Sequence, residues 1–181
     1  MDFDTLKKSL SYGNVCSSGQ YVMRETGSDA TLKEVTIRDI PENSLVIKMD
    51  KINFTNLFNS NVIKSWGFNK HSDYLIVTQD RLVFVEMKSR TSVNRELEEE
   101  CRKKFLSDSC TINYADNIFT KLLYKNSFFN NKKTHYVLLY QSVSVNKKSF
   151  LNLSQPSNNT PETFRKIAVC NEAIISYNRV I

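Results

Sequence analysis

Three charged residues near the middle of the chain have the types and the spacing that phosphodiester hydrolysis requires. Asp73 is followed, after twelve intervening residues, by Glu86 and then by Lys88. Two neighbouring carboxylates repel each other unless a cation lies between them, and Mg²⁺ accepts such ligands while it keeps waters of its own. The metal would lower the pKa of an attacking water, and a nearby lysine would hold that water or the phosphate. The three residues are therefore candidates for a metal-dependent hydrolytic site.

A predicted β-hairpin brings these residues together. Segment 73–88 contains two apolar, β-branched runs around a polar turn, which is typical of paired strands in the centre of a sheet. Because side chains alternate between the faces of a strand, Glu86 and Lys88 share one face and Met87 points to the other. Asp73 opens the first strand, so pairing within the hairpin places it across from the end that carries Glu86. The hairpin thus predicts two carboxylates and an ammonium at one edge of a sheet.

This arrangement resembles the active-site motif of the PD-(D/E)XK nuclease superfamily, which has a restriction-endonuclease-like fold. In that superfamily the Asp begins the second core strand, the ExK sequence lies on the third, and a helix follows. The resemblance covers roughly residues 33–140 and depends on a sparse motif. It implies that Asp73 and Glu86 bind Mg²⁺ or Mn²⁺, that the Met87 carbonyl also ligates the metal, and that Lys88 assists catalysis.

The motif departs from the superfamily pattern in two respects. Ser72, and not proline, precedes the Asp. The additional carboxylate that a leading helix often supplies is not evident. Candidates for it are Glu25, Glu34 and Asp50. A second interpretation stays open, because short motifs also occur by chance, and Glu86 and Lys88 would then form a solvated pair at the edge of the sheet.

Other elements are expected around the hairpin, in an α/β fold with a mixed central sheet of four or five strands flanked by helices. Amphipathic helices are predicted at 92–106 and 110–124. We expect Met87 to pack beneath the first of them, and the acidic run 96–100 to form its solvated face. Three of the four glycines predict a loop at 12–31. A short helix is expected at 1–11, and strands are expected at 35–37, 45–49 and 136–140. The short runs at 167–169 and 173–175 are expected either to form a last strand or to pair with the edge of the sheet.

The composition limits the classes of function. The chain of 181 residues is 40% hydrophobic and 24% charged, as expected for a single globular domain over 1–181. No apolar run approaches the roughly 20 residues that span a bilayer, and no signal peptide is evident at the start, so we expect a cytoplasmic protein without a membrane partner. The GxxxxGK[ST], GxGxxG and GxSxG motifs are absent, which argues against nucleotide hydrolysis, dinucleotide chemistry and α/β-hydrolase chemistry.

The net charge of +6 favours a polyanionic partner. We therefore expect metal-dependent cleavage of nucleic acid, with DNA as the favoured substrate. The chain is short, so a homodimer or a partner subunit is expected to supply specificity. Two alternatives remain open: an inactive nuclease fold that binds DNA or a protein, and an adaptor that carries the motif by chance. Binding of Mg²⁺ or Mn²⁺ would distinguish an active site from an adaptor.

Overall fold

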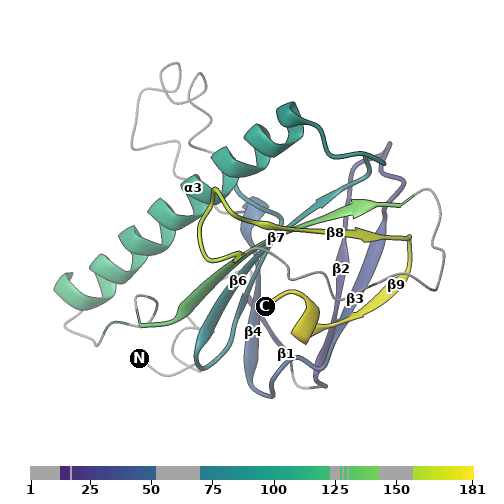
Figure 1. Cartoon of the computed structure of the whole chain (residues 1–181). Coiled ribbons are helices and arrows are strands. Elements are labelled where there is room, and N and C mark those ends of the chain that lie inside the picture. Colours follow the sequence, from purple (N-terminus) through teal and green to yellow (C-terminus); the bar gives the residue numbers. More distant parts are fainter. Residues whose placement is uncertain are drawn as a thin grey trace.

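The computed structural model describes residues 13–16, 18–51, 70–122, 127, 129, 131–142 and 157–181. These residues form a mixed α/β structure in three layers (Figure 1): a long helix, a six-stranded sheet and a three-stranded sheet. Within these ranges, no helix is both long and apolar enough to cross a membrane. The helix expected at 1–11 lies outside the described residues.

The large sheet has the strand order β1-β4-β5-β6-β7-β8. Neighbouring strands from β1 to β6 are antiparallel, whereas β6, β7 and β8 run parallel. A parallel pair requires a crossover connection, and helix α3 (Arg95–Asn117), continued by the π-helical turn η3 (Ile118–Leu122), lies between β6 and β7 in the chain. The strands are β1 (Gly13–Cys16), β4 (Ser44–Lys48), β5 (Tyr74–Val77), β6 (Arg81–Lys88), β7 (Lys133–Gln141) and β8 (Arg165–Val169).

The small sheet joins segments that are far apart in the sequence. It contains β2 (Gln20–Arg24), β3 (Glu34–Arg38) and β9 (Ala173–Ser176), with β3 in the centre. β2 is antiparallel to β3, and β9 is parallel to it. Two short 3-10 turns, η1 (Met49–Lys51) and η4 (Tyr177–Arg179), follow β4 and β9.

The alternation of side chains along β6 explains the three layers. Leu82 and Phe84 belong to the apolar cluster that contains the buried side of α3. Val83, Val85 and Met87 belong to a second cluster, which is shared with the small sheet. Both faces of the large sheet are therefore covered, and its central strands are apolar on both sides, as a doubly covered sheet requires.

Helix α3 begins where the sequence provides a cap. The Asn94 side chain accepts a hydrogen bond from the Leu97 N–H at 3.0 Å, which satisfies one of the free donors of the first turn. Leu97, Cys101 and Phe105 then recur every four residues and are fully buried. This stripe fixes the side of the helix that lies against the sheet.

The structure confirms the hairpin and the strands expected at 35–37, 45–49 and 136–140, and the short runs at 167–169 and 173–175 also form strands. The prediction of a loop at 12–31 was wrong, because β1 and β2 form there by pairing with β4 and β3. Gly19, at a φ of 66°, makes the turn between them, where a residue with a side chain would be strained. The large sheet consequently has six strands, and not four or five.

Two expectations about the helix were also wrong. The two predicted helices form one continuous helix. Asp108 lies in the gap between the predicted ranges, but in the structure it belongs to α3, is buried and accepts a hydrogen bond from the Ser72 N–H. Met87 does not pack beneath this helix. It lies in the cluster on the opposite face, because the helix covers the face that carries Glu86 and Lys88.

The position of Met87 gives a direct test of this layering. Met87→Asp should lower the free energy of unfolding by roughly 3 kcal/mol or more, because it buries an unpaired carboxylate between two sheets. Ile174→Asp is the matched control, since Ile174 is 65% exposed on β9, and it should change stability by about 0.5 kcal/mol or less. Urea denaturation measures both variants. Equal losses in the two would contradict the assigned faces.

Candidate active site

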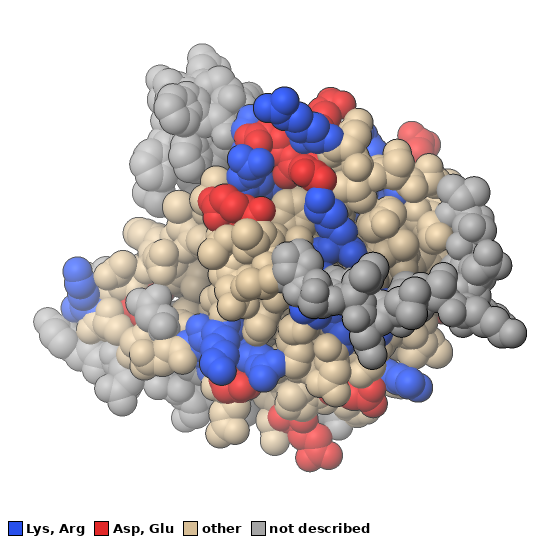
Figure 2. Space-filling view, viewed as in Figure 1, with Lys and Arg blue, Asp and Glu red and all other residues tan. Residues whose placement is uncertain are grey.

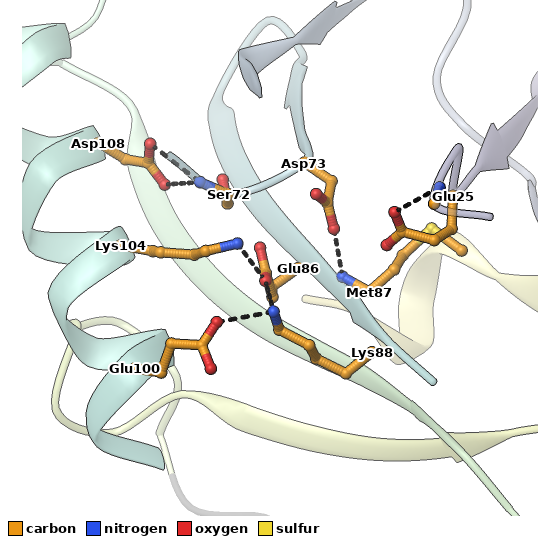
Figure 3. Close-up of polar contacts among 10 residues, drawn as sticks. Glu25, Ser72, Asp73, Glu86, Met87, Lys88, Glu100, Lys104 and Asp108 are labelled. Atoms are coloured by element: carbon orange, nitrogen blue, oxygen red, sulfur yellow. Dashed lines mark hydrogen bonds and ion pairs between the residues drawn. The ribbon is translucent and has the colours of Figure 1, made fainter. Parts of the chain in front are cut away.

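Asp73 lies opposite Glu86 at the end of the β5–β6 ladder. The last pair in that ladder is Tyr74 with Val85, and one further step along both strands brings Asp73 and Glu86 together. The Asp73 Oδ2 atom accepts a hydrogen bond from the Met87 N–H at 2.7 Å. The Asp73 side chain thus takes the place of a β5 carbonyl at the point where the strand begins. This bond holds its carboxylate beside the ExK segment (Figure 3).

Glu86 is fully buried and is surrounded by cations from two elements. Its Oε1 atom lies 3.0 Å from the ammonium of Lys88 and 2.5 Å from that of Lys104, on α3. Lys88 also lies 2.8 Å from Glu100 on the same helix. Buried charges are stable only when they are paired in this way. The network therefore holds α3 against the C-terminal end of β6.

The second carboxylate oxygen of Glu86, Oε2, does not share the lysine contacts of Oε1. Oε2 is buried and has no hydrogen-bond partner among the described residues. A buried acceptor without a partner is costly and needs an explanation. Since both lysines contact Oε1, Oε2 is the side of Glu86 that remains for a ligand.

The two carboxyl groups act strongly on each other. Burial and the neighbouring charge of Glu86 raise the pKa of Asp73 to about 8, although Lys104 and the Met87 N–H oppose this shift. Burial also raises the pKa of Glu86, against the opposing effect of the two lysines. Repulsion between carboxyls that share a site raises a pKa in this manner. A cation placed between them would relieve that repulsion.

The lysines remain charged at the site. Burial favours the neutral amine of Lys88, but the charge of Glu86 and the bond to Glu100 outweigh it and raise the pKa. The pKa of Lys104 is likewise raised by Glu86 and Asp73, although burial opposes this. Neither lysine is therefore suited to act as a base, and both can stabilise negative charge.

The three candidates for a further carboxylate differ in position. Glu34 forms an ion pair with Arg24 in the small sheet, and Asp50 lies 3.9 Å from Lys48. The charge of Glu25 contributes to the raised pKa of Asp73. Within the described ranges, no group of three His, Cys, Asp or Glu side chains is arranged to hold a metal. A third carboxylate ligand therefore stays a prediction, and Glu25 is best placed for it.

The loop that carries Glu25 is attached to the end of β6. The Ser89 hydroxyl accepts hydrogen bonds from the Thr31 N–H at 2.9 Å and the Leu32 N–H at 3.0 Å. This attachment joins the β2–β3 connection to the residue directly after Lys88. Glu25 consequently lies on the Met87 side of the site (Figure 3).

Sequence reasoning missed Lys104, and it placed Glu100 wrongly on a solvated face. Both residues stand three positions after a buried residue of the apolar stripe, Leu97 and Cys101, and therefore lie on the side of α3 that faces the sheet. Asp108 occupies the next such position, after Phe105. A row of charged residues beside an apolar stripe was the available signal for these contacts.

Asp108 positions the start of β5. Its oxygens accept the Ser72 N–H at 3.1 and 3.3 Å, and Oδ1 lies 2.9 Å from His71 Nδ1. All three residues are buried. The contacts fix the backbone immediately before Asp73. His71 thus has a structural partner and does not face an open site.

Comparison of the chain with protein-family models, with curated proteins and with solved structures found no match. The chemical interpretation of the site therefore depends on its geometry.

The donors present are compatible with a divalent cation. Glu86 has a buried, unpartnered oxygen, and Asp73 uses Oδ2 for Met87, which leaves Oδ1. The N–H and the carbonyl of one strand residue point to the same side, so the Met87 carbonyl faces the line of β5. Two carboxylate oxygens and a carbonyl suit Mg²⁺ or Mn²⁺, which complete their shells with water.

The raised pKa of Asp73 predicts a pH dependence of stability. Between pH 4 and 8 the folded protein retains a proton that the unfolded chain releases, so the free energy of unfolding falls as the pH rises. Asp73→Asn should remove this loss, which approaches about 1.4 kcal/mol per pH unit within that window. Urea denaturation at pH 5 and pH 8, without divalent ions, measures the difference.

Asp80→Asn is the control. Asp80 is exposed, and although burial acts to raise its pKa, the hydrogen bonds to Thr78 and Arg81 and the charge of Arg81 together outweigh burial and lower the pKa. Its difference from the wild type should stay constant between these two pH values. An Asp73→Asn difference that is equally constant would mean that Asp73 ionises normally in the folded protein.

Proposed function

We propose that this protein is a metal-dependent nuclease with a restriction-endonuclease-like fold, and that its substrate is DNA. The observation that carries the proposal is the facing pair Asp73 and Glu86 at the end of β5 and β6, with Lys88 beside them. The order of elements supports it as well. An antiparallel run of β4, β5 and β6 is followed by a helix and by a parallel β7, in keeping with the PD-(D/E)XK pattern that the motif resembles.

In this proposal Asp73, Glu86 and the Met87 carbonyl hold Mg²⁺ or Mn²⁺. The bound metal would supply an activated water and would polarise the phosphate. The Asp73 carboxylate is oriented by the Met87 N–H, and Glu86 is oriented by Lys88 on its other oxygen. Lys88 stays protonated and stabilises the negative charge that develops on the phosphate.

Binding of the nucleic acid is attributed to cations outside this cluster. Figure 2 shows Lys and Arg side chains in several separate groups on one face of the molecule, with acidic side chains between them. Contacts from these cations to phosphates would position the nucleic acid without reading its sequence, while the acidic side chains between them would repel it. A homodimer or partner subunit is the proposed source of specificity, and a cytoplasmic location remains a prediction.

One observation favours a second candidate function, an inactive nuclease fold that binds DNA or a protein. Lys88 and Lys104 already neutralise Glu86, so the site is charge-compensated by the protein itself. Within the described residues a third carboxylate is not assembled. A binding module would retain the fold and the ion pairs, but it would not hydrolyse the substrate.

Nuclease assays with Mg²⁺ or Mn²⁺ on single- and double-stranded DNA and on RNA distinguish these functions. Asp73→Ala should abolish metal-dependent cleavage, and Lys88→Ala should slow it by about a hundredfold or more, as expected when one electrostatic stabiliser is lost. Lys103→Ala, which removes an exposed charge on α3, is the control and should retain near-normal activity.

DNA affinity, measured by fluorescence anisotropy at two salt concentrations, should fall in each variant by no more than the loss of one phosphate contact would cause. Cleavage that survives both Asp73→Ala and Lys88→Ala would place the active site elsewhere. Salt-sensitive binding without cleavage by the wild type would favour the binding module.

A further inference from the structure

Lys104 extends from α3 toward the two carboxyl groups of the candidate site (Figure 3). Its ammonium lies 2.5 Å from Glu86 Oε1, and its charge also acts on Asp73. The Lys104 side chain is 13% exposed and that of Glu86 is 0% exposed, so the pair forms inside the protein. Such a pair is strong because solvent screens it little. Lys104 thus supplies positive charge where a divalent ion would bind.

The second lysine of the cluster has a different set of partners. Lys88 contacts Glu100 at 2.8 Å in addition to Glu86, so it stays paired even if Glu86 is engaged elsewhere. The ion pair of Lys104 is with Glu86. A metal that takes over the charge of Glu86 would therefore remove the ion-pair partner of Lys104 and leave it only the more distant charges of Asp73 and Glu100, whereas Lys88 would keep an ion-pair partner.

We propose that Lys104 is the internal counter-ion of the metal-free site, and that a divalent ion displaces its ammonium from Glu86. The inference rests on the proposed function, since it requires that Asp73 and Glu86 take a metal. Three positive charges, from a divalent ion and one lysine, around the same buried carboxylate would repel one another strongly. The long, flexible stem of lysine allows the ammonium to move to solvent without movement of the helix.

This exchange has two consequences. The empty site stays neutralised, so the fold does not need the metal in order to bury Glu86. Metal binding must break a charge-assisted contact, so the affinity of the wild type for metal is lower than that of a site without Lys104. Removal of the ammonium should therefore tighten metal binding.

Titration calorimetry with Mn²⁺ tests the affinity directly, without any substrate. Lys104→Met keeps the length of the side chain and removes the charge, and it should bind Mn²⁺ about tenfold more tightly or better. Lys103→Met is the matched control on the exposed side of the same helix. It should bind Mn²⁺ with the affinity of the wild type.

A second measurement uses the wild type alone, and so does not depend on the folding of a variant. Amine-reactive labelling, resolved lysine by lysine with mass spectrometry, should be slow at Lys104 without metal. Saturating Mn²⁺ should increase it several-fold and leave Lys103 unchanged. This distinguishes displacement of the ammonium from simple repulsion of the metal, which would leave Lys104 protected.

The outcomes for the inference and for the proposed function are separable. Mn²⁺ binding of equal strength in all three proteins, or unchanged labelling of Lys104 in the metal-bound wild type, would overturn the inference and leave the metal site standing. Failure of all three to bind Mn²⁺ would overturn both. Binding by Lys104→Met but not by the wild type would support the counter-ion and contradict a metal-dependent activity of the natural protein.

Discussion

Burial of one carboxylate, that of Glu86, is the constraint on which the arrangement of the site depends. Glu86 lies on a central strand, at 0% exposure, beneath a helix. Burial of an unpaired carboxylate in such a position would destabilise the folded protein by several kcal/mol. The helix meets this requirement with Lys104, and β6 meets it with Lys88, which Glu100 in turn orients. The same ion pairs that neutralise Glu86 consequently also hold α3 against the sheet.

A second constraint is that β5 begins only at Tyr74, two residues short of the position opposite Met87. The ladder with β6 stops at Tyr74, so the N–H of Met87 has no strand opposite it. The Asp73 side chain accepts this hydrogen bond. Asp108 performs a similar task one residue earlier, for the Ser72 N–H. The end of a strand thus leaves backbone groups to be satisfied, and the carboxylates that satisfy them are brought to one place.

The same geometry is compatible with both proposed functions. A site with facing carboxylates and an unpartnered oxygen suits a metal, while two ammoniums on the other oxygen make the site stable without one. Which state prevails is a question of relative free energies between a lysine and a hydrated divalent ion. Both competitors act on the same buried carboxylate, so the nuclease and the binding module differ in one equilibrium and not in the fold.

The sequence by itself determined the local features. Alternation along 73–88 predicted the hairpin and placed Asp73, Glu86 and Lys88 at one end of it, because strand periodicity and turn chemistry are properties of adjacent residues. Spacing of four predicted the buried stripe of α3. The mixed α/β class followed from the same patterns, since short apolar runs and an amphipathic helix alternate along the chain.

Only the tertiary structure decided which surfaces meet. The pairing of β1 with β4 and of β9 with β3 joins distant segments, and no local pattern encodes such partners. Met87 was assigned correctly to the face opposite Glu86, but what covers that face is the small sheet and not the helix. Lys104 and Glu100 resembled surface charges, because the local sequence does not show which surface covers their side of the helix. Their spacing shows a helical face, but only packing against β6 makes that face an interior, where charge pairing is required.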